Sequence, residues 1–107
     1  MMSNTARVFA VALLAGAFAA GPALAITAGD VMDKMNSDQR SSFLSGAVDM
    51  ASHLYAIDGN RTKGECALDW YFRTEGSLRE VHTFFDAHKD KDAVGLLSIL
   101  INRHCGK

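Results

Sequence analysis

The sequence predicts an all-α fold, a small bundle of about four helices crosslinked by one disulfide bond. Beyond residue 25, apolar residues recur at intervals of three and four, which is the period of an amphipathic helix. No segment shows the sustained alternation of apolar and polar residues that is typical of a half-buried strand. The only proline is Pro22, so nothing beyond it interrupts a helix, and the short connections favour antiparallel neighbours.

Residues 1–25 have the features of a bacterial secretory signal peptide. Arg7 is their only charged residue, an apolar run follows from Val8 to Ala20, and Ala23-Leu24-Ala25 places small residues before a cleavage site. The run is shorter than the roughly 20 residues that a membrane-spanning helix needs. We therefore expect cleavage near Ala25, no stable membrane anchor, and a periplasmic or secreted protein.

Cleavage leaves one domain, residues 26–107, with ten basic and 12 acidic side chains and no proline. This balance argues against a nucleic-acid partner, which would require a basic face. A domain of this size buries only about 60–65% of its unfolded surface, so its stability is marginal. Cys66 and Cys105, the only cysteines, are expected to pair in an oxidising compartment and to contribute about 4 kcal/mol. Their spacing fits neither a redox pair nor a zinc site.

The longest predicted helix begins with Ser37 as its N-cap and runs to about Ile57, where Gly59 ends it. A shorter helix is predicted before it, over residues 28–35. Gly46 costs the long helix about 1 kcal/mol relative to alanine, which predicts the close approach of another helix there. The predicted buried face of the long helix consists of Phe43, Ala47, Met50, Ala51, Leu54 and Ile57.

The second half of the domain is predicted to contain two further long helices. A polar loop over residues 58–64 and a short helix or turn over residues 66–73 precede them. Ser77-Leu-Arg-Glu80 has the pattern of a capping box, which starts the first of these helices. Asp90 or Asp92 caps the last helix, which ends at Cys105-Gly106. The predicted apolar faces are Leu78, Val81, Phe84, Phe85 and His88 in the first, and Ala93, Val94, Leu97, Leu100 and Ile101 in the second.

The ionisable residues predict no catalytic site, no cofactor and no metal centre. His82 and Asp86 are four residues apart and could orient a general base, but no serine or cysteine nucleophile accompanies them. A solvated pair on a helix face is the simpler interpretation. The carboxylates do not cluster, and no metal-binding or phosphate-loop motif occurs. Four histidines leave open a response to mildly acidic pH.

Trp70-Tyr71-Phe72 is the main indication of binding. Three adjacent aromatic side chains cannot all point inward from a regular element, and Trp and Tyr are enriched at binding hot spots. Alternatively, Trp70 and Phe72 line a core near Cys66 while Tyr71 lies flat on the surface. The neighbouring polar loop could add hydrogen bonds to a protein partner. The candidate partner-binding residues are Asn60, Arg61, Lys63, Trp70 and Tyr71.

The segment Ser42-Phe43-Leu44-Ser45-Gly46-Ala47-Val48-Asp49 is similar to a G-Y-x-x-G-x-x-D helix, although Ser42 and Phe43 replace its first two residues. A cysteine, a Ser-capped helix, a His-containing turn and an alanine-containing helix closing on a second cysteine follow, at Cys66, Ser77, His88, Ala93 and Cys105. In this order of features, residues 40–106 resemble the Rap/Tai-type immunity proteins. The resemblance implies an exported helical protein that binds and inhibits a peptidoglycan amidase toxin of type VI secretion. The family's prolines are absent here, and the stretch from Cys66 to Ser77 is longer.

A second class of function stays open. The Hde-type periplasmic acid-stress chaperones are similar in being small, helical and provided with two cysteines. A protein of this class would partly unfold at about pH 2–3, where carboxylates approach neutrality. In those chaperones the long helix lies between the cysteines, whereas here both cysteines follow it. Either class is compatible with a homodimer, which the sequence leaves open.

Overall fold

The computed structural model describes residues 25–107, so almost all of the predicted signal peptide lies outside the described residues. From residue 25 onward the fold is all-α, as predicted, and contains no strand. Four α-helices and two short π-helical segments follow one another along the chain. They are η2 (Asp30–Lys34), α2 (Ser37–Ile57), α3 (Arg61–Leu68), η3 (Asp69–Arg73), α4 (Ser77–Ala87) and α5 (Ala93–Cys105).

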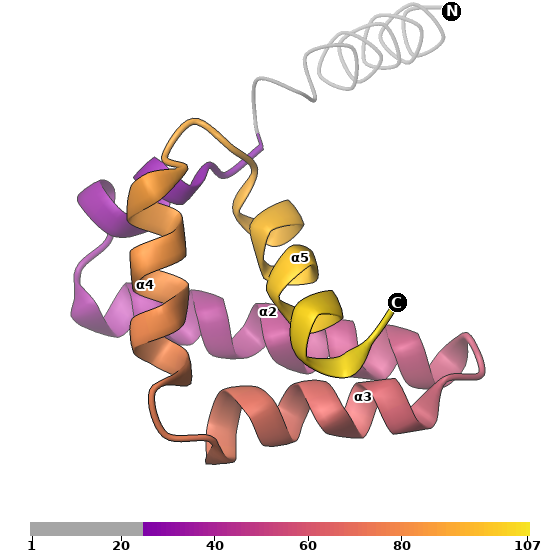
Figure 1. The fold of residues 1–107 in the computed structure, drawn as a ribbon. Coiled ribbons are helices and arrows are strands. Elements are labelled where there is room, and N and C mark those ends of the chain that lie inside the picture. The colour runs from indigo at the N-terminus through magenta and orange to yellow at the C-terminus, as the bar shows by residue number, and fades with distance from the viewer. Residues whose placement is uncertain (1–24) are drawn as a thin grey trace, which may run out of the picture.

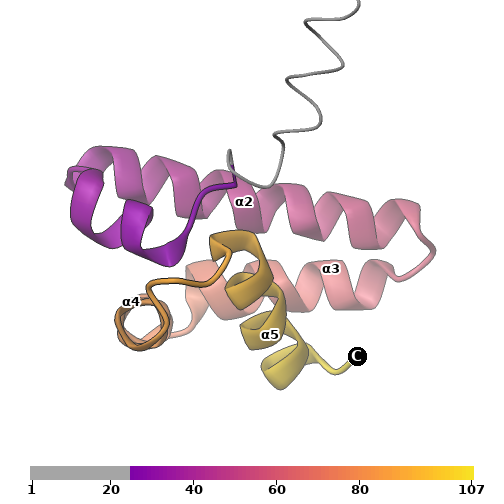
Figure 2. The same ribbon diagram turned by 90° about the horizontal axis from the view of Figure 1, so that it is seen from above.

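Helices α2 and α3 lie side by side and run antiparallel, so that they form a helical hairpin (Figures 1 and 2). Figure 2 looks along the axis of α4 while α2 and α3 lie across the view, which shows that α4 crosses the hairpin steeply. Helix α5 then slopes back towards α3. The expected number of helices is therefore correct, and α4 and α5, which run in opposite directions in Figure 1, are inclined to the hairpin.

One core joins all of these elements. It lies between the hairpin, the two crossing helices and η2, and every element from η2 to α5 supplies at least one fully or almost fully buried side chain. The largest completely buried side chains are Phe85, Leu44, Leu100, Ile101, Val31, Val48 and Val81. Burial of side chains of this size contributes about 1.5–3 kcal/mol each, which is the main stabilisation available to a small helical domain.

The first described residues pair with the connection between α4 and α5. The Ala28 amide donates to the Lys91 carbonyl at 2.8 Å, and the Gly29 amide donates to the Lys89 carbonyl at 2.9 Å. In the opposite direction, the Ala93 amide donates to the Ile26 carbonyl at 2.9 Å. The paired segment, residues 26–29, directly follows the predicted cleavage site at Ala25.

The short helix predicted over residues 28–35 is present as a helical turn that includes η2. Arg40, which lies one turn into α2, holds the C-terminal end of this preceding helical turn. The Arg40 Nε atom donates to the Val31 carbonyl at 3.1 Å, and Nη2 donates to the carbonyls of Met32 at 2.9 Å and Met35 at 3.2 Å. These bonds satisfy carbonyls that the end of a helix leaves without backbone partners.

Helix α2 begins one residue before the predicted position and is rotated relative to the prediction. Asn36, and not Ser37, is the N-cap: its side chain accepts from the Gln39 amide, and the Gln39 side chain accepts from the Asn36 amide. The residues of α2 that are buried are Leu44, Val48 and Ser52. Of the six residues predicted to form the core face, Phe43, Ala47 and Ala51 pack at its edge, while Met50, Leu54 and Ile57 are exposed.

The close helix approach occurs at Gly64 and not at Gly46. A Cβ atom on Gly46 would meet nothing within 4 Å, whereas one on Gly64 would stand 2.5 Å from the carbonyl oxygen of Ser52. The polar loop predicted over residues 58–64 is also shorter than expected. Gly59 ends α2 with a φ of +90°, and α3 already begins at Arg61. The segment predicted over residues 66–73 consequently continues α3 into η3.

The expected capping box at the start of α4 is wrong. Gly76, with a φ of +87°, precedes the helix and makes no side-chain cap. The Ser77 hydroxyl instead donates to the Tyr71 carbonyl at 2.8 Å, and the Leu78 side chain is about half exposed. The cap of α5 is confirmed at Asp92, whose carboxylate accepts from the Gly95 amide at 2.7 Å. In α5, Leu96 is buried and Val94 is exposed, against the prediction for Val94.

Candidate functional site

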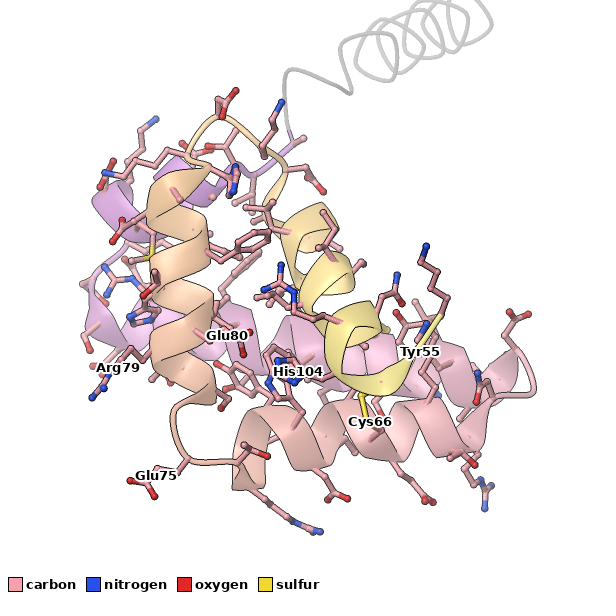
Figure 3. All side chains as sticks on the ribbon, viewed as in Figure 1. Tyr55, Cys66, Glu75, Arg79, Glu80 and His104 are labelled. Atoms are coloured by element: carbon pink, nitrogen blue, oxygen red, sulfur yellow. A yellow bond between two sulfur atoms is a disulfide. The ribbon has the colours of Figure 1, made fainter. Side chains whose placement is uncertain are left out.

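The predicted disulfide between Cys66 and Cys105 is present and joins α3 to the end of α5, with the two Cα atoms 5.8 Å apart. Figure 3 shows Cys66 where α5 approaches α3. A second contact reinforces this junction, because the Lys63 Nζ atom donates to the Asn102 Oδ1 atom at 2.6 Å. The ammonium group also lies 4.6 Å from the centre of the Tyr55 ring, a cation–π contact. Lys63 therefore connects α2, α3 and α5.

The structure separates the five residues that the sequence nominated for partner binding. Asn60 and Arg61 are exposed at the turn between α2 and α3, where the Asn60 side chain caps α3 by accepting from the Lys63 amide. Lys63 and Trp70 are 9% and 4% exposed, so neither side chain is available to a partner. Tyr71 is intermediate. Asn60, Arg61 and Tyr71 are therefore surface residues at two separate places on the fold. Lys63 and Trp70 are buried and support the core.

Trp70 is buried beside the disulfide and stacks on His104, with the ring centres 4.9 Å apart and the planes inclined by 19°. The His104 Nε2 atom lies 2.7 Å from the Glu80 Oε1 atom of α4, and Figure 3 shows these two side chains turned towards each other. Of the three aromatic residues, Phe72 is the most exposed. The alternative that placed Trp70 in the core was thus correct, but its assignment of Phe72 to the core was wrong.

An exposed apolar stripe runs along the C-terminal half of α2. Met50, Leu54 and Ile57 are 59%, 55% and 70% exposed, and their spacing of four and three places them on one side of the helix. This side is roughly opposite the buried one that carries Leu44 and Val48. Among the described residues, α2 therefore has one apolar face in the core and another, which we call the outer stripe, in solvent. The outer stripe ends next to Asn60 and Arg61.

A pocket of about 330 Å³ lies between the N-terminal half of α2, η3 and the start of α4. Arg40, Ser41, Tyr71, Phe72, Leu78 and His82 are among its lining residues. Sequence reasoning missed this pocket, because its walls come from three segments that only the tertiary fold brings together. The sequence shows three serines at intervals of four on α2 (37, 41 and 45), which share one face of the helix. It does not show that residues of η3 and α4 lie opposite them.

The two ionisable residues that the sequence singled out, His82 and Asp86, both lie on α4. His82 lines the pocket and is partly buried. Burial lowers the pKa of its imidazole, the positive charge of Arg40 lowers it further, and Asp86 opposes both effects. Between residues 25 and 107, no group of three or more His, Cys, Asp or Glu side chains is placed to hold a metal ion.

Carboxylates instead form contacts at the surface. Asp33 pairs with Lys89 at 3.0 Å, which joins η2 to the connection after α4. The Asp30 carboxylate accepts from the Thr27 amide at 3.1 Å, and this bond, aided by Lys34, lowers the pKa of Asp30. The Asp33 contact raises the pKa of Lys89.

No family model, curated protein or solved structure matches the chain. Among residues 25–107, no helix combines the length and the apolar character that crossing a membrane requires.

Proposed function

We propose that the protein is an exported, non-catalytic binding protein that captures one protein partner on the outer stripe of α2 and the adjoining turn. The exposure of Met50, Leu54 and Ile57 is the observation that carries this proposal. Three large apolar side chains in a row on one helix face are a stronger sign of an interaction site than apolar residues scattered singly.

The surroundings of the outer stripe suit a docking surface. Asn60 and Arg61 follow Ile57 by three and four residues and are exposed, so they would lie at the polar edge of an interface centred on the stripe. Arginine is among the residues enriched at interfaces, and a polar rim around an apolar centre is the usual anatomy. This retains two of the residues that the sequence nominated.

The scaffold beneath the stripe is rigid, which favours tight binding. The close packing of Gly64 against Ser52 sets the spacing of α2 and α3, and the disulfide ties α3 to α5. A surface that is already ordered loses little conformational entropy on association. Occlusion of a partner's active site by such a surface needs no chemistry from the binding protein itself.

The resemblance to the Rap/Tai-type immunity proteins suggests the kind of partner. We propose a peptidoglycan amidase toxin with a Cys–His active site, encoded next to this protein. The test is to purify such a neighbouring amidase, measure its affinity for the protein by calorimetry, and measure peptidoglycan hydrolysis with and without the protein. Hydrolysis should stop at a 1:1 ratio. An unaffected amidase, or a neighbourhood without one, would contradict this assignment.

Two matched variants test the surface. Leu54→Asp places a charge in the middle of the outer stripe and should weaken binding by about 30-fold or more, the effect of losing an interface hot spot. Val94→Asp makes the same change at a similarly exposed apolar residue of α5 and should leave the affinity unchanged. Equal effects of the two variants would refute the outer stripe as the docking surface. Light scattering on the unliganded protein tells whether a second copy occupies the stripe instead.

One observation favours an acid-stress chaperone as the second candidate. The ion pair of Asp33 with Lys89 and the contacts of the Asp30 carboxylate with the Thr27 amide and with Lys34 gather at one end of the fold, and neutralisation of these carboxylates would weaken them. Near-ultraviolet circular dichroism from pH 7 to about pH 2.5 tests this candidate. Loss of tertiary signal together with suppression of aggregation of an acid-denatured client would support it. Full retention of tertiary signal would eliminate it.

A further inference from the structure

The pocket between α2, η3 and α4 has a positive charge in one wall and no carboxylate in its lining. Arg40 supplies the permanent charge, and serine hydroxyls of α2 line the same wall. The Tyr71 and His82 side chains add further polar groups. A site lined in this way by described residues favours an anion over a cation, because nothing in it would compensate a bound positive charge.

Arg40 has hydrogen-bonding capacity left over. Its Nε and Nη2 atoms are engaged with the carbonyls of Val31, Met32 and Met35. The remaining guanidinium nitrogen, Nη1, has no partner among residues 25–107. The carbonyl bonds fix the guanidinium plane, so the free nitrogen is held in place before any ligand arrives. An arginine held in this way is suited to a carboxylate, since a charge-assisted hydrogen bond forms with little loss of side-chain entropy.

The other walls are apolar. Leu44 is fully buried behind the pocket, while Phe72 and Leu78 are each about half exposed at its edge. The volume of about 330 Å³ falls at the lower end of the range for small-ligand sites. It accommodates a phenyl group or a short acyl chain. Such a ligand would also cover the exposed parts of Phe72 and Leu78.

We propose that this pocket binds a monocarboxylate with a small apolar group, the carboxylate meeting Arg40 and the serine hydroxyls and the apolar group lying against Leu44, Phe72 and Leu78. The site is separate from the outer stripe, which occupies the other half of α2 and a different side of the helix. The two proposals can therefore fail independently.

The probe is 3-phenylpropanoate, and 3-phenylpropanamide is its uncharged match. Both are titrated into the disulfide-bonded, ¹⁵N-labelled protein obtained by expressing the whole chain. We expect the carboxylate to shift amide resonances of the pocket-lining segments of α2, η3 and α4, and to bind at least tenfold more tightly than the amide. Equal affinities of the carboxylate and the amide would overturn the proposal. The absence of shifts at about 10 mM carboxylate would also overturn it, since a Kd of 10 mM corresponds to a binding free energy of roughly −2.7 kcal/mol.

Three variants assign the contacts. Arg40→Gln should abolish the preference for the carboxylate over the amide. Arg40 also holds η2 in place through its bonds to backbone carbonyls. Ser41→Ala and Leu78→Ala therefore provide tests at exposed positions that do not depend on η2. Each of them should weaken binding about three- to tenfold. Leu54→Ala, on the outer stripe, is the control and should leave the affinity unchanged. Unchanged binding in both Ser41→Ala and Leu78→Ala would place the ligand elsewhere.

A carboxylate of this kind could be a free small molecule or the end of a polypeptide. The peptide Gly-Gly-Phe with a free C-terminus distinguishes these sources. Tighter binding than that of 3-phenylpropanoate supports a polypeptide end as the natural ligand, whereas weaker binding supports a free small molecule. Failure of both to bind would contradict the carboxylate site altogether.

Discussion

Gly64 of α3 lies so close to Ser52 of α2 that a methyl group at Gly64 would stand 2.5 Å from the Ser52 carbonyl oxygen. The obstacle is a backbone atom, so it cannot rotate away. The two helices of the hairpin pack at this distance because position 64 has no side chain. Packing of this kind controls the geometry of everything that α2 presents, including the outer stripe.

Gly64→Ala should therefore destabilise the fold. The gain in helix propensity of about 1 kcal/mol is outweighed by forcing the helices apart, for which overpacking typically costs 1–3 kcal/mol or more. We expect a net loss of about 1–2 kcal/mol in urea unfolding. Gly46→Ala is the matched control, because a Cβ atom there meets nothing, and it should stabilise by about 0.5–1 kcal/mol. A neutral Gly64→Ala variant would show that the hairpin is loosely packed.

Loss of the disulfide should be the most damaging single covalent change. The bond closes a loop with a sequence separation of 39, for which the chain-entropy model gives about 4 kcal/mol. This is a large part of the stability of a domain of this size. Reduction, or the double variant Cys66→Ser with Cys105→Ser, should shift the urea midpoint strongly downward. Reductant added to the double variant should have no effect, and a midpoint that is insensitive to reduction in the parent would contradict the expectation.

The stability of the protein should fall as His82 becomes protonated. Its folded-state pKa is lowered, mainly by burial, so the unfolded chain binds the proton more tightly than the folded one. The free energy of unfolding attributable to His82 is therefore highest above the unfolded pKa of about 6.5 and decreases as the pH falls from there towards the folded pKa. His82→Gln should flatten this pH dependence, measured by urea unfolding between pH 7.5 and about pH 5. Asp86→Asn should steepen it, because Asp86 opposes the shift.

Asp92 should be important as the cap of α5. Its carboxylate accepts from the Gly95 amide at 2.7 Å, and replacement of such a cap by alanine costs about 1 kcal/mol. Asp92→Asn retains a side-chain oxygen and should cost much less. Thermal unfolding of the two variants gives the comparison. Equal losses in both would mean that the negative charge, and not the hydrogen bond, stabilises the start of the helix.

The sequence was sufficient to predict the all-α class, the disulfide and the approximate limits of the long helices. Helical period, glycine and cap residues are local signals, and each reports on a few neighbouring residues. The errors at Ser37 and Ser77 also have a local origin. Asn36 and Ser37 are both good caps in adjacent positions, and the Ser77 hydroxyl donates to the Tyr71 carbonyl and does not accept from an amide of its own helix.

The orientation of α2 could not be predicted in the same way. The helix carries two apolar stripes, one with Leu44 and Val48 and one with Met50, Leu54 and Ile57. Periodicity identifies such stripes but cannot tell which of them meets the rest of the chain. The choice depends on contacts between different helices, such as the packing of Gly64 on Ser52, which periodicity within one helix does not report. The stripe that was predicted as the core is consequently the surface most worth testing for a partner.

The pairing of the first described residues with the start of α5 has a consequence for the order of folding. Chains emerge from the ribosome, and from an export channel, beginning at the N-terminus. The hydrogen bond between Ile26 and Ala93 cannot form until Ala93 has emerged, and the disulfide of Cys66 cannot form until Cys105 has emerged. The hairpin of α2 and α3 can assemble early from local contacts, while the N-terminal segment remains without its partner until α5 has appeared. Any protease acting near Ala25 would therefore meet an open segment first and a paired one only after the last helix has docked.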